Sequence, residues 1–125
     1  MSLRVHHIAL RARDPDATER FYVSVLGLRV VSRQPARGSV WLDADGVIVM
    51  VERAESGERL PAEGTPPGTK DLVAFAVDDL PAWRRRLVEA GVPIEGETPN
   101  TLYVRDPDGR RVGVSTYVFQ APGPP

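Results

Sequence analysis

The 125 residues are enough for one domain with a sizeable core and too few for two ordinary domains. The formal net charge of −1 gives no reason to expect a nucleic acid or an anionic membrane as a partner, and the absence of cysteine excludes disulfides and thiolate metal sites. The sequence has no apolar run near the roughly 20 residues of a membrane span and no apolar signal-peptide core, so we expect a cytoplasmic protein.

The first half of the sequence predicts one strand, one helix and three further strands. Residues 5–13 alternate in polarity, so that Ile8 lies on the face expected to pack on a helix and His7 lies on the opposite, mixed face. Asp14 is suited to cap the following helix, which we expect to end at Gly27. The three further strands are predicted at residues 30–33, 39–43 and 46–52.

The second half repeats this order at an offset of about 64–65 residues, which indicates an internal duplication. A strand is predicted at residues 72–77, a helix from Asp79 to Gly91, and three short strands at 93–95, 101–105 and 110–117. We interpret residues 54–69, rich in glycine and proline, as the linker between module one at 3–53 and module two at 70–118. The prediction is a single α+β domain over residues 3–118, followed by a loose tail at 119–125.

A βαβββ module leaves one face of its sheet without a helix. Two such modules either bury these faces against each other or curve around a shared pocket. The residues alone leave both arrangements open.

Four motifs carry a resemblance to a known family. They read HHIAL at residues 6–10, FYxxVLGL at 21–28, LVAFAVDDL at 72–80 and YVRDPDG at 103–109. In this order, and with the duplication, the sequence resembles the vicinal-oxygen-chelate superfamily, which includes glyoxalase I, the fosfomycin- and bleomycin-resistance proteins and the extradiol dioxygenases. The resemblance implies two tandem βαβββ modules that form a curved, partly barrel-like sheet around a small-molecule cavity, and usually a homodimer.

The resemblance also implies where the metalloenzymes of this family would hold a divalent metal. The corresponding positions here are His7, Met50, Leu72 and Gly113. Only the histidine is a good ligand, whereas a catalytic zinc needs about three protein ligands and an open position. We therefore expect no metal and no other cofactor. If a divalent metal is bound, its expected ligands are His7 and Glu52, because Glu52 lies two residues from Met50 on the same face.

The residues expected to share the face of His7 combine small, aromatic and basic side chains. Those predicted to bind a ligand are Arg11, Trp41, Met50, Leu72, Tyr103, Arg111 and Gly113. Small residues at the floor and aromatic walls are typical of a site for an apolar or aromatic small molecule. Arg11 and Arg111 are suited to hold a carboxylate or phosphate on such a molecule.

Each of these residues also has a purely structural interpretation. His7 is either a general base or ligand, or a histidine of the core. Trp41 and Tyr103 are either core residues or residues that stack on a ligand. Arg11 either binds an anion or ends a strand in solvent. Residues 106–109, Asp-Pro-Asp-Gly, are typical of a turn, and we assign them no catalytic role.

Three functions are compatible with the sequence. We favour metal-independent binding or sequestration of an aromatic or acidic small molecule, as in the bleomycin-resistance proteins; those proteins are strongly acidic, so a cationic glycopeptide is not the expected ligand of this nearly neutral chain. The alternative is a divalent-metal-dependent lyase, isomerase or dioxygenase of the glyoxalase type with relocated ligands. The third is a non-catalytic partner or regulatory domain, which predicts an exposed apolar patch and no pocket. Whether the chain is an enzyme stays open.

Overall fold

The computed structural model describes residues 2–61 and 70–119 and divides them into two compact units. Unit 1 contains residues 2–61 together with Asp106–Arg110, and unit 2 contains Lys70–Arg105 together with residues 111–119. Half of the predicted linker, residues 62–69, and most of the predicted tail, residues 120–125, lie outside the described residues.

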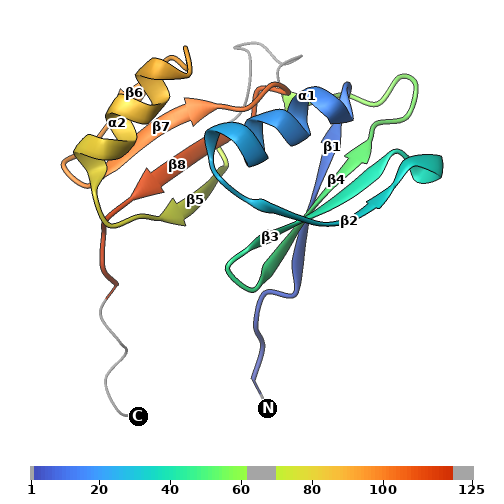
Figure 1. Cartoon of the computed structure of the whole chain (residues 1–125), viewed down its shortest axis with the longest axis horizontal. Coiled ribbons are helices and arrows are strands. Elements are labelled where there is room, and N and C mark those ends of the chain that lie inside the picture. The colour runs from blue at the N-terminus through green and yellow to red at the C-terminus, as the bar shows by residue number, and fades with distance from the viewer. Residues whose placement is uncertain (1, 62–69, 120–125) are drawn as a thin grey trace. The chain divides into compact units, whose positions relative to one another are not determined.

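Unit 1 is a four-stranded mixed sheet with a helical segment, and we call this sheet A (Figure 1). Its strand order is β1-β4-β3-β2, in which β1 is parallel to β4 and the other neighbours are antiparallel. The elements are β1 (His7–Ala12), α1 (Pro15–Arg20), the π-helical η1 (Phe21–Val25), β2 (Arg29–Gln34), the 3-10 turn η2 (Pro35–Arg37), β3 (Ser39–Ala44) and β4 (Val47–Arg53).

Unit 2 repeats this plan in a second sheet, which we call sheet B. Its strand order is β5-β8-β7-β6, again with the first strand parallel to the last. The elements are β5 (Leu72–Ala76), α2 (Leu80–Glu89), β6 (Gly96–Glu97), β7 (Thr101–Arg105) and β8 (Arg111–Ser115). Both sheets are open and mixed, so the predicted α+β class with two βαβββ modules is confirmed.

The first helical segment begins where the sequence predicts and continues differently. The Asp14 carboxylate accepts hydrogen bonds from the backbone N–H groups of Asp16 (3.1 Å) and Ala17 (3.3 Å), which caps α1. From Phe21 the segment is π-helical, and the N–H of Leu26 bonds the carbonyl of Phe21 five residues earlier. The consecutive side chains of Phe21 and Tyr22 are both buried in this turn.

One predicted strand of unit 2 lies further along the chain than expected. The strand predicted at residues 93–95 is wrong, because the structure forms β6 at Gly96–Glu97, where Gly96 pairs with Tyr103. Pro93 lacks an N–H group to donate to a neighbouring strand. The first hydrogen bond to β7 comes from the backbone N–H of Glu95, which donates to the Tyr103 carbonyl at 2.9 Å, and β6 begins at the next residue.

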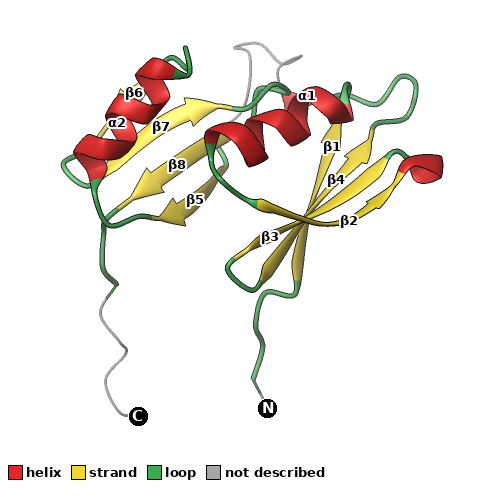
Figure 2. Ribbon diagram, viewed as in Figure 1, coloured by secondary structure: helices red, strands yellow, loops and turns green. Residues whose placement is uncertain are grey.

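Each helix covers one face of its own sheet, as Figure 2 shows for α1 on sheet A and α2 on sheet B. The covered face of sheet A buries alternate residues of β1, β3 and β4, such as Leu42 and Val49, whereas Ala9 on the other face is exposed. In sheet B, Leu102 and Val112 are buried in the same way, with Leu87 of α2. Within residues 2–61 and 70–119, every helix is too short or too polar to cross a membrane.

Replacing Leu87 with alanine should destabilise the protein by about 2–5 kcal/mol, because it removes a fully buried side chain and leaves a cavity. The matched control is Val88→Ala on the same helix, whose side chain is 64% exposed and whose loss should cost less than about 0.5 kcal/mol. Urea unfolding followed by circular dichroism measures both. Equal losses in the two variants would contradict the assigned packing face of α2.

Candidate functional site

The face of sheet A that α1 leaves open carries most of the predicted site residues of unit 1. Strand pairing aligns them in rows across the sheet, and the central row is Ala9, Met50 and Trp41. The next row is Arg11, Glu52 and Ser39, one side-chain repeat further along the strands. Ala9 therefore has little side-chain bulk of its own and lies in the same row as Trp41, one row away from Arg11.

The corresponding face of sheet B has the same arrangement. Its central row is Ala74, Gly113 and Tyr103, the register equivalents of Ala9, Met50 and Trp41. A Cβ atom placed on Gly113 would lie 3.4 Å from the Ala74 Cβ, Leu72 Cδ1 and Thr101 Cγ2 atoms. The side chains around Gly113 are therefore closely packed and leave only a shallow depression above this glycine. The duplication thus places one aromatic side chain and one small floor residue in each unit.

The side chains of Trp41 and Tyr103 are half-buried. This degree of burial is intermediate between that expected of a core residue and that expected of a ligand contact. The Trp41 Nε1 atom is buried and has no hydrogen-bond partner in the part of the chain that the structure describes. The same is true of the Oγ atom of Ser39, which lies on the same face of β3. Two buried donors without acceptors on one face are uncommon in folded proteins.

Arg111 is held in place on sheet B by a ring and a carboxylate. Its guanidinium lies 4.0 Å from the centre of the Tyr103 ring, and its Nε atom is 3.2 Å from a carboxylate oxygen of Glu95. The other Glu95 oxygen accepts a hydrogen bond from Arg105 at 2.8 Å. The hydrogen bond from Arg105, together with both positive charges, lowers the pKa of Glu95.

Arg11 in sheet A is also paired, with a residue that the sequence did not single out. Its Nε and Nη2 atoms donate to Glu58, at 3.0–3.2 Å from the carboxylate oxygens, and its Nη1 atom lies 3.8 Å from Glu52. The hydrogen bond from Arg11 lowers the pKa of Glu58, and the pKa of Arg11 is raised by the same contact. The structure therefore shows neither a solvated strand end nor a free cation. Glu58 lies in the predicted linker, where no local pattern pointed to a partner 47 residues away.

His7 lies at an exposed position near the start of β1, unlike a core histidine. Its Nδ1 atom is 2.9 Å from the Nδ1 atom of His6. Register places His7 opposite Ile48, and Glu52 opposite Arg11, four residues further along. Four residues of strand span about 13 Å, so the structure does not bring His7 and Glu52 together.

The residues that the family positions supply do not fit a divalent metal. In unit 1 they are His7 and the thioether of Met50, and in unit 2 they are Leu72 and Gly113, whose side chains have no donor atom. Among residues 2–61 and 70–119 there is no group of three or more His, Cys, Asp and Glu side chains that could hold an ion.

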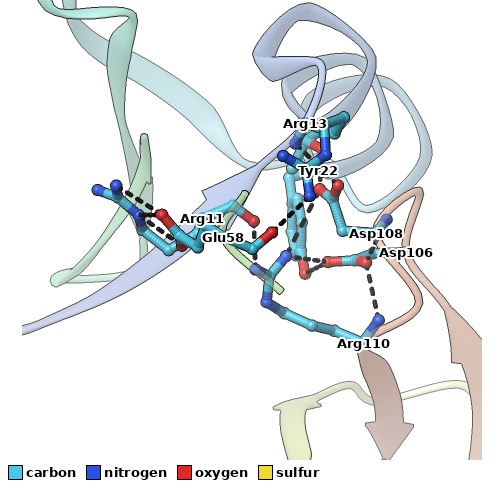
Figure 3. A network of polar contacts seen from close by, with 8 residues as sticks. Arg11, Arg13, Tyr22, Glu58, Asp106, Asp108 and Arg110 are labelled. Carbon is cyan, nitrogen blue, oxygen red and sulfur yellow. Dashed lines mark hydrogen bonds and ion pairs between the residues drawn. The ribbon is translucent and has the colours of Figure 1, made fainter. Parts of the chain in front are cut away.

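A network of polar contacts joins the Asp-Pro-Asp-Gly string to the end of β1 within unit 1 (Figure 3). The Tyr22 hydroxyl donates to Asp106 at 2.7 Å, and Asp108 accepts from the Thr18 hydroxyl at 2.7 Å. Arg110 pairs with Asp106 at 3.2 Å and donates to the backbone carbonyl of Arg11. The string is a turn, as predicted, but its two aspartates are also buried anchors. Turn chemistry accounted for both residues in the sequence, which gave no reason to look for distant partners.

Burial and the neighbouring Asp106 carboxylate raise the pKa of Tyr22, because both disfavour the phenolate. The hydroxyl therefore stays protonated and remains a donor to Asp106 over the ordinary pH range. Asp106 also accepts from the backbone N–H groups of Asp108 (2.9 Å) and Arg110 (3.0 Å), so its buried carboxylate is well compensated.

Unit 1 also contains a cavity of about 260 Å³ lined by residues of α1, η2, β2, β3 and β4, including Asp16, Arg33 and Arg53. None of the seven residues predicted to bind a ligand lines it.

Comparison with known proteins gives a consistent result. Residues 4–114 match the family described as the Glyoxalase/Bleomycin resistance protein/Dioxygenase superfamily. The chain is 28% identical over 124 residues to Virulence protein STM3117 of Salmonella typhimurium, covering 92% of this chain and 85% of that protein. It is 30% identical over 129 residues to Biphenyl-2,3-diol 1,2-dioxygenase 3 of Rhodococcus globerulus, covering 95% of this chain and 66% of the dioxygenase. It also resembles the crystal structure of lactoylglutathione lyase from Agrobacterium tumefaciens, with a TM-score of 0.69, 27% identity, and 90% and 92% of the two chains covered.

Removing the Tyr22 hydroxyl in the variant Tyr22→Phe should lower the free energy of unfolding by about 1–3 kcal/mol, because a buried carboxylate loses one of its donors. Tyr117→Phe makes the same chemical change at a side chain that is 55% exposed and should change it by less than about 0.5 kcal/mol. Urea unfolding at neutral pH separates the two. A Tyr22→Phe variant as stable as the wild type would show that the contact with Asp106 does not stabilise unit 1.

Proposed function

Because the chain belongs to the Glyoxalase/Bleomycin resistance protein/Dioxygenase superfamily, we propose that it binds an aromatic small molecule without a metal ion. The observation that carries this proposal is the pair of equivalent rows on the open sheet faces, Trp41 with Ala9 and Tyr103 with Ala74. In sheet B, Gly113 lies between Ala74 and Tyr103, so a flat apolar ligand has both a stacking partner and room there. In sheet A, the Met50 side chain lies between Ala9 and Trp41 and adds an apolar contact to the same row.

The polar groups of these faces support an aromatic ligand with a few hydrogen-bonding groups. Among the described residues, the buried Trp41 Nε1 and Ser39 Oγ atoms have no acceptor, and Arg11 and Arg111 bring positive charge that is already paired with carboxylates. A relative named for biphenyl-2,3-diol, which is 30% identical to this chain, supports the same class of ligand.

The donor chemistry at the family positions supports metal-independent binding. A leucine, a glycine and a thioether at three of the four family positions leave His7 alone, and a single imidazole is not enough for a catalytic zinc. The distance along the strands between His7 and Glu52 opposes the relocated metal site that an enzyme of the glyoxalase type would need. Binding or sequestration therefore accounts for the site better than metal-dependent catalysis does.

The ligand test uses the chain's two tryptophans. In a Trp83→Phe background, where Trp41 is the remaining indole, biphenyl-2,3-diol should quench tryptophan emission with the same dissociation constant in the presence and absence of EDTA. Trp41→Phe keeps Trp83 and corrects for absorption by the ligand. By calorimetry, Trp41→Ala should weaken binding about two- to tenfold, the range expected for the loss of one aromatic contact.

Two results would contradict the proposal. One is quenching that needs added manganese, iron, nickel or zinc and disappears in His7→Ala. The other is an unchanged emission of Trp41 together with no heat of binding.

We also propose that the protein is a homodimer. β1 and β2 form the edges of sheet A, and β5 and β6 those of sheet B, so that each unit offers backbone groups that a second copy can cover. The edge strand β2 also exposes Val31, with 56% of its surface accessible. Sedimentation equilibrium at micromolar concentration should give twice the 13.7 kDa of one chain. A mass of one chain at that concentration would overturn this part.

A further inference from the structure

Arg11 and Glu58 form the most complete ion pair on the open face of sheet A. The Nε and Nη2 atoms of Arg11 present one edge of the guanidinium to both carboxylate oxygens of Glu58 (Figure 3). This two-point geometry is the one with which arginine binds carboxylate ligands. The two side chains are 36% and 26% exposed, so the pair is reachable from solvent.

The backbone around Glu58 is held mainly by contacts that do not involve this pair. The Arg13 guanidinium donates to the carbonyl oxygens of Glu55 (3.4 Å) and Glu58 (2.6 Å), and the Glu58 N–H bonds the Glu55 carbonyl. The N–H of Ala54 bonds the carbonyl of Ala12 at 2.8 Å. The Glu58 side chain gives up one backbone contact, from the N–H of Glu55, when it turns away. The turn can therefore stay in place while its carboxylate leaves Arg11.

The position of Arg11 suits a ligand that joins a carboxylate to a ring. Arg11 is two residues from Ala9 on the same face of β1, a distance of about 7 Å, and Ala9 shares its row with Trp41. A carboxylate on Arg11 can therefore place an attached ring over the Ala9 methyl group, in the row that continues through Met50 to the indole of Trp41. Glu52 is already 3.8 Å from Arg11, so a ligand anion added beside both glutamates would meet an excess of negative charge. Exchange of one carboxylate for another keeps the charge constant.

We propose that Glu58 is an internal competitor which occupies Arg11 in the empty site, and that the protein's ligand is an aromatic carboxylate which displaces it. This inference rests on the proposed function and names the ligand class of the same face. Because Glu58 is tethered beside Arg11, it competes at a high effective concentration. Neutral aromatic molecules do not need the exchange, so their binding is independent of Glu58.

The experiment compares benzoate with its neutral amide, benzamide, in the full-length Trp83→Phe protein, by calorimetry and Trp41 emission. Glu58→Gln should tighten benzoate binding about five- to tenfold, since its competitor loses the negative charge that Arg11 binds. Benzamide binding should change less than twofold. Glu55→Gln is the matched control. It also removes one negative charge, three residues before Glu58, but the Glu55 side chain makes no hydrogen bond to Arg11.

Two further variants keep the test decisive. Arg11→Lys, added to Glu58→Gln, keeps the charge but lacks the two-point edge and should abolish the gain for benzoate. If circular dichroism shows that Glu58→Gln is unfolded, Glu58→Asp replaces it, because the shorter carboxylate withdraws from Arg11 and should give a gain in the same direction.

The inference is overturned if benzoate binds the folded Glu58 variant no more tightly than the wild type, if Glu55→Gln gives the same gain, or if benzoate binds to neither. In each of these cases, binding of biphenyl-2,3-diol to the wild type would leave the proposed function standing. Loss of both ligands would reject the two together.

Discussion

The open sheet face is the constraint on which the rest of the structure depends. Each unit has a four-stranded sheet whose side chains alternate between two faces, and its main helix covers only one of them. In sheet A, Leu42 and Val49 fill the covered face, and the same alternation places Trp41 and Met50 on the other. The chemistry of this second face is therefore fixed by the strand register that builds the core, and a functional site there needs no additional element of structure.

Charge on these faces is balanced by the chain itself. Arg11 is paired with Glu58 and Arg111 with Glu95, so neither guanidinium is a ready anion site. The basic residues of these faces are therefore compatible with a nearly neutral chain. In the proposed exchange, the net binding free energy from Arg11 is the difference between its contact with the ligand carboxylate and its contact with Glu58, which favours selectivity between ligands over high affinity. The Tyr22–Asp106 contact differs, because it is buried and joins η1 to the turn at residues 106–109.

Local rules were sufficient for most of the elements, but not for the π-helical turn, the position of β6 or the long-range polar contacts. The alternation of β1, the Asp14 cap and the duplication predicted both βαβββ units and the face on which His7 and Trp41 lie. The π-helical turn could not be predicted, because it depends on a bond over five residues that no residue type specifies. Glu58 and Asp108 were missed as partners of Arg11 and Thr18 because composition and turn chemistry already explained them locally.

Binding without a metal is the central claim, and metal content tests it most directly. Untagged protein purified without chelator, alongside a His7→Ala variant, would be analysed for bound metal per chain before and after incubation with manganese, iron, nickel and zinc. If the protein binds its ligand without a metal, both proteins should contain far less than one metal ion per chain, with no difference between them. One metal ion per chain in the wild type that is lost in His7→Ala would contradict it, and would mean that ligands other than the four family positions complete a metal site around His7.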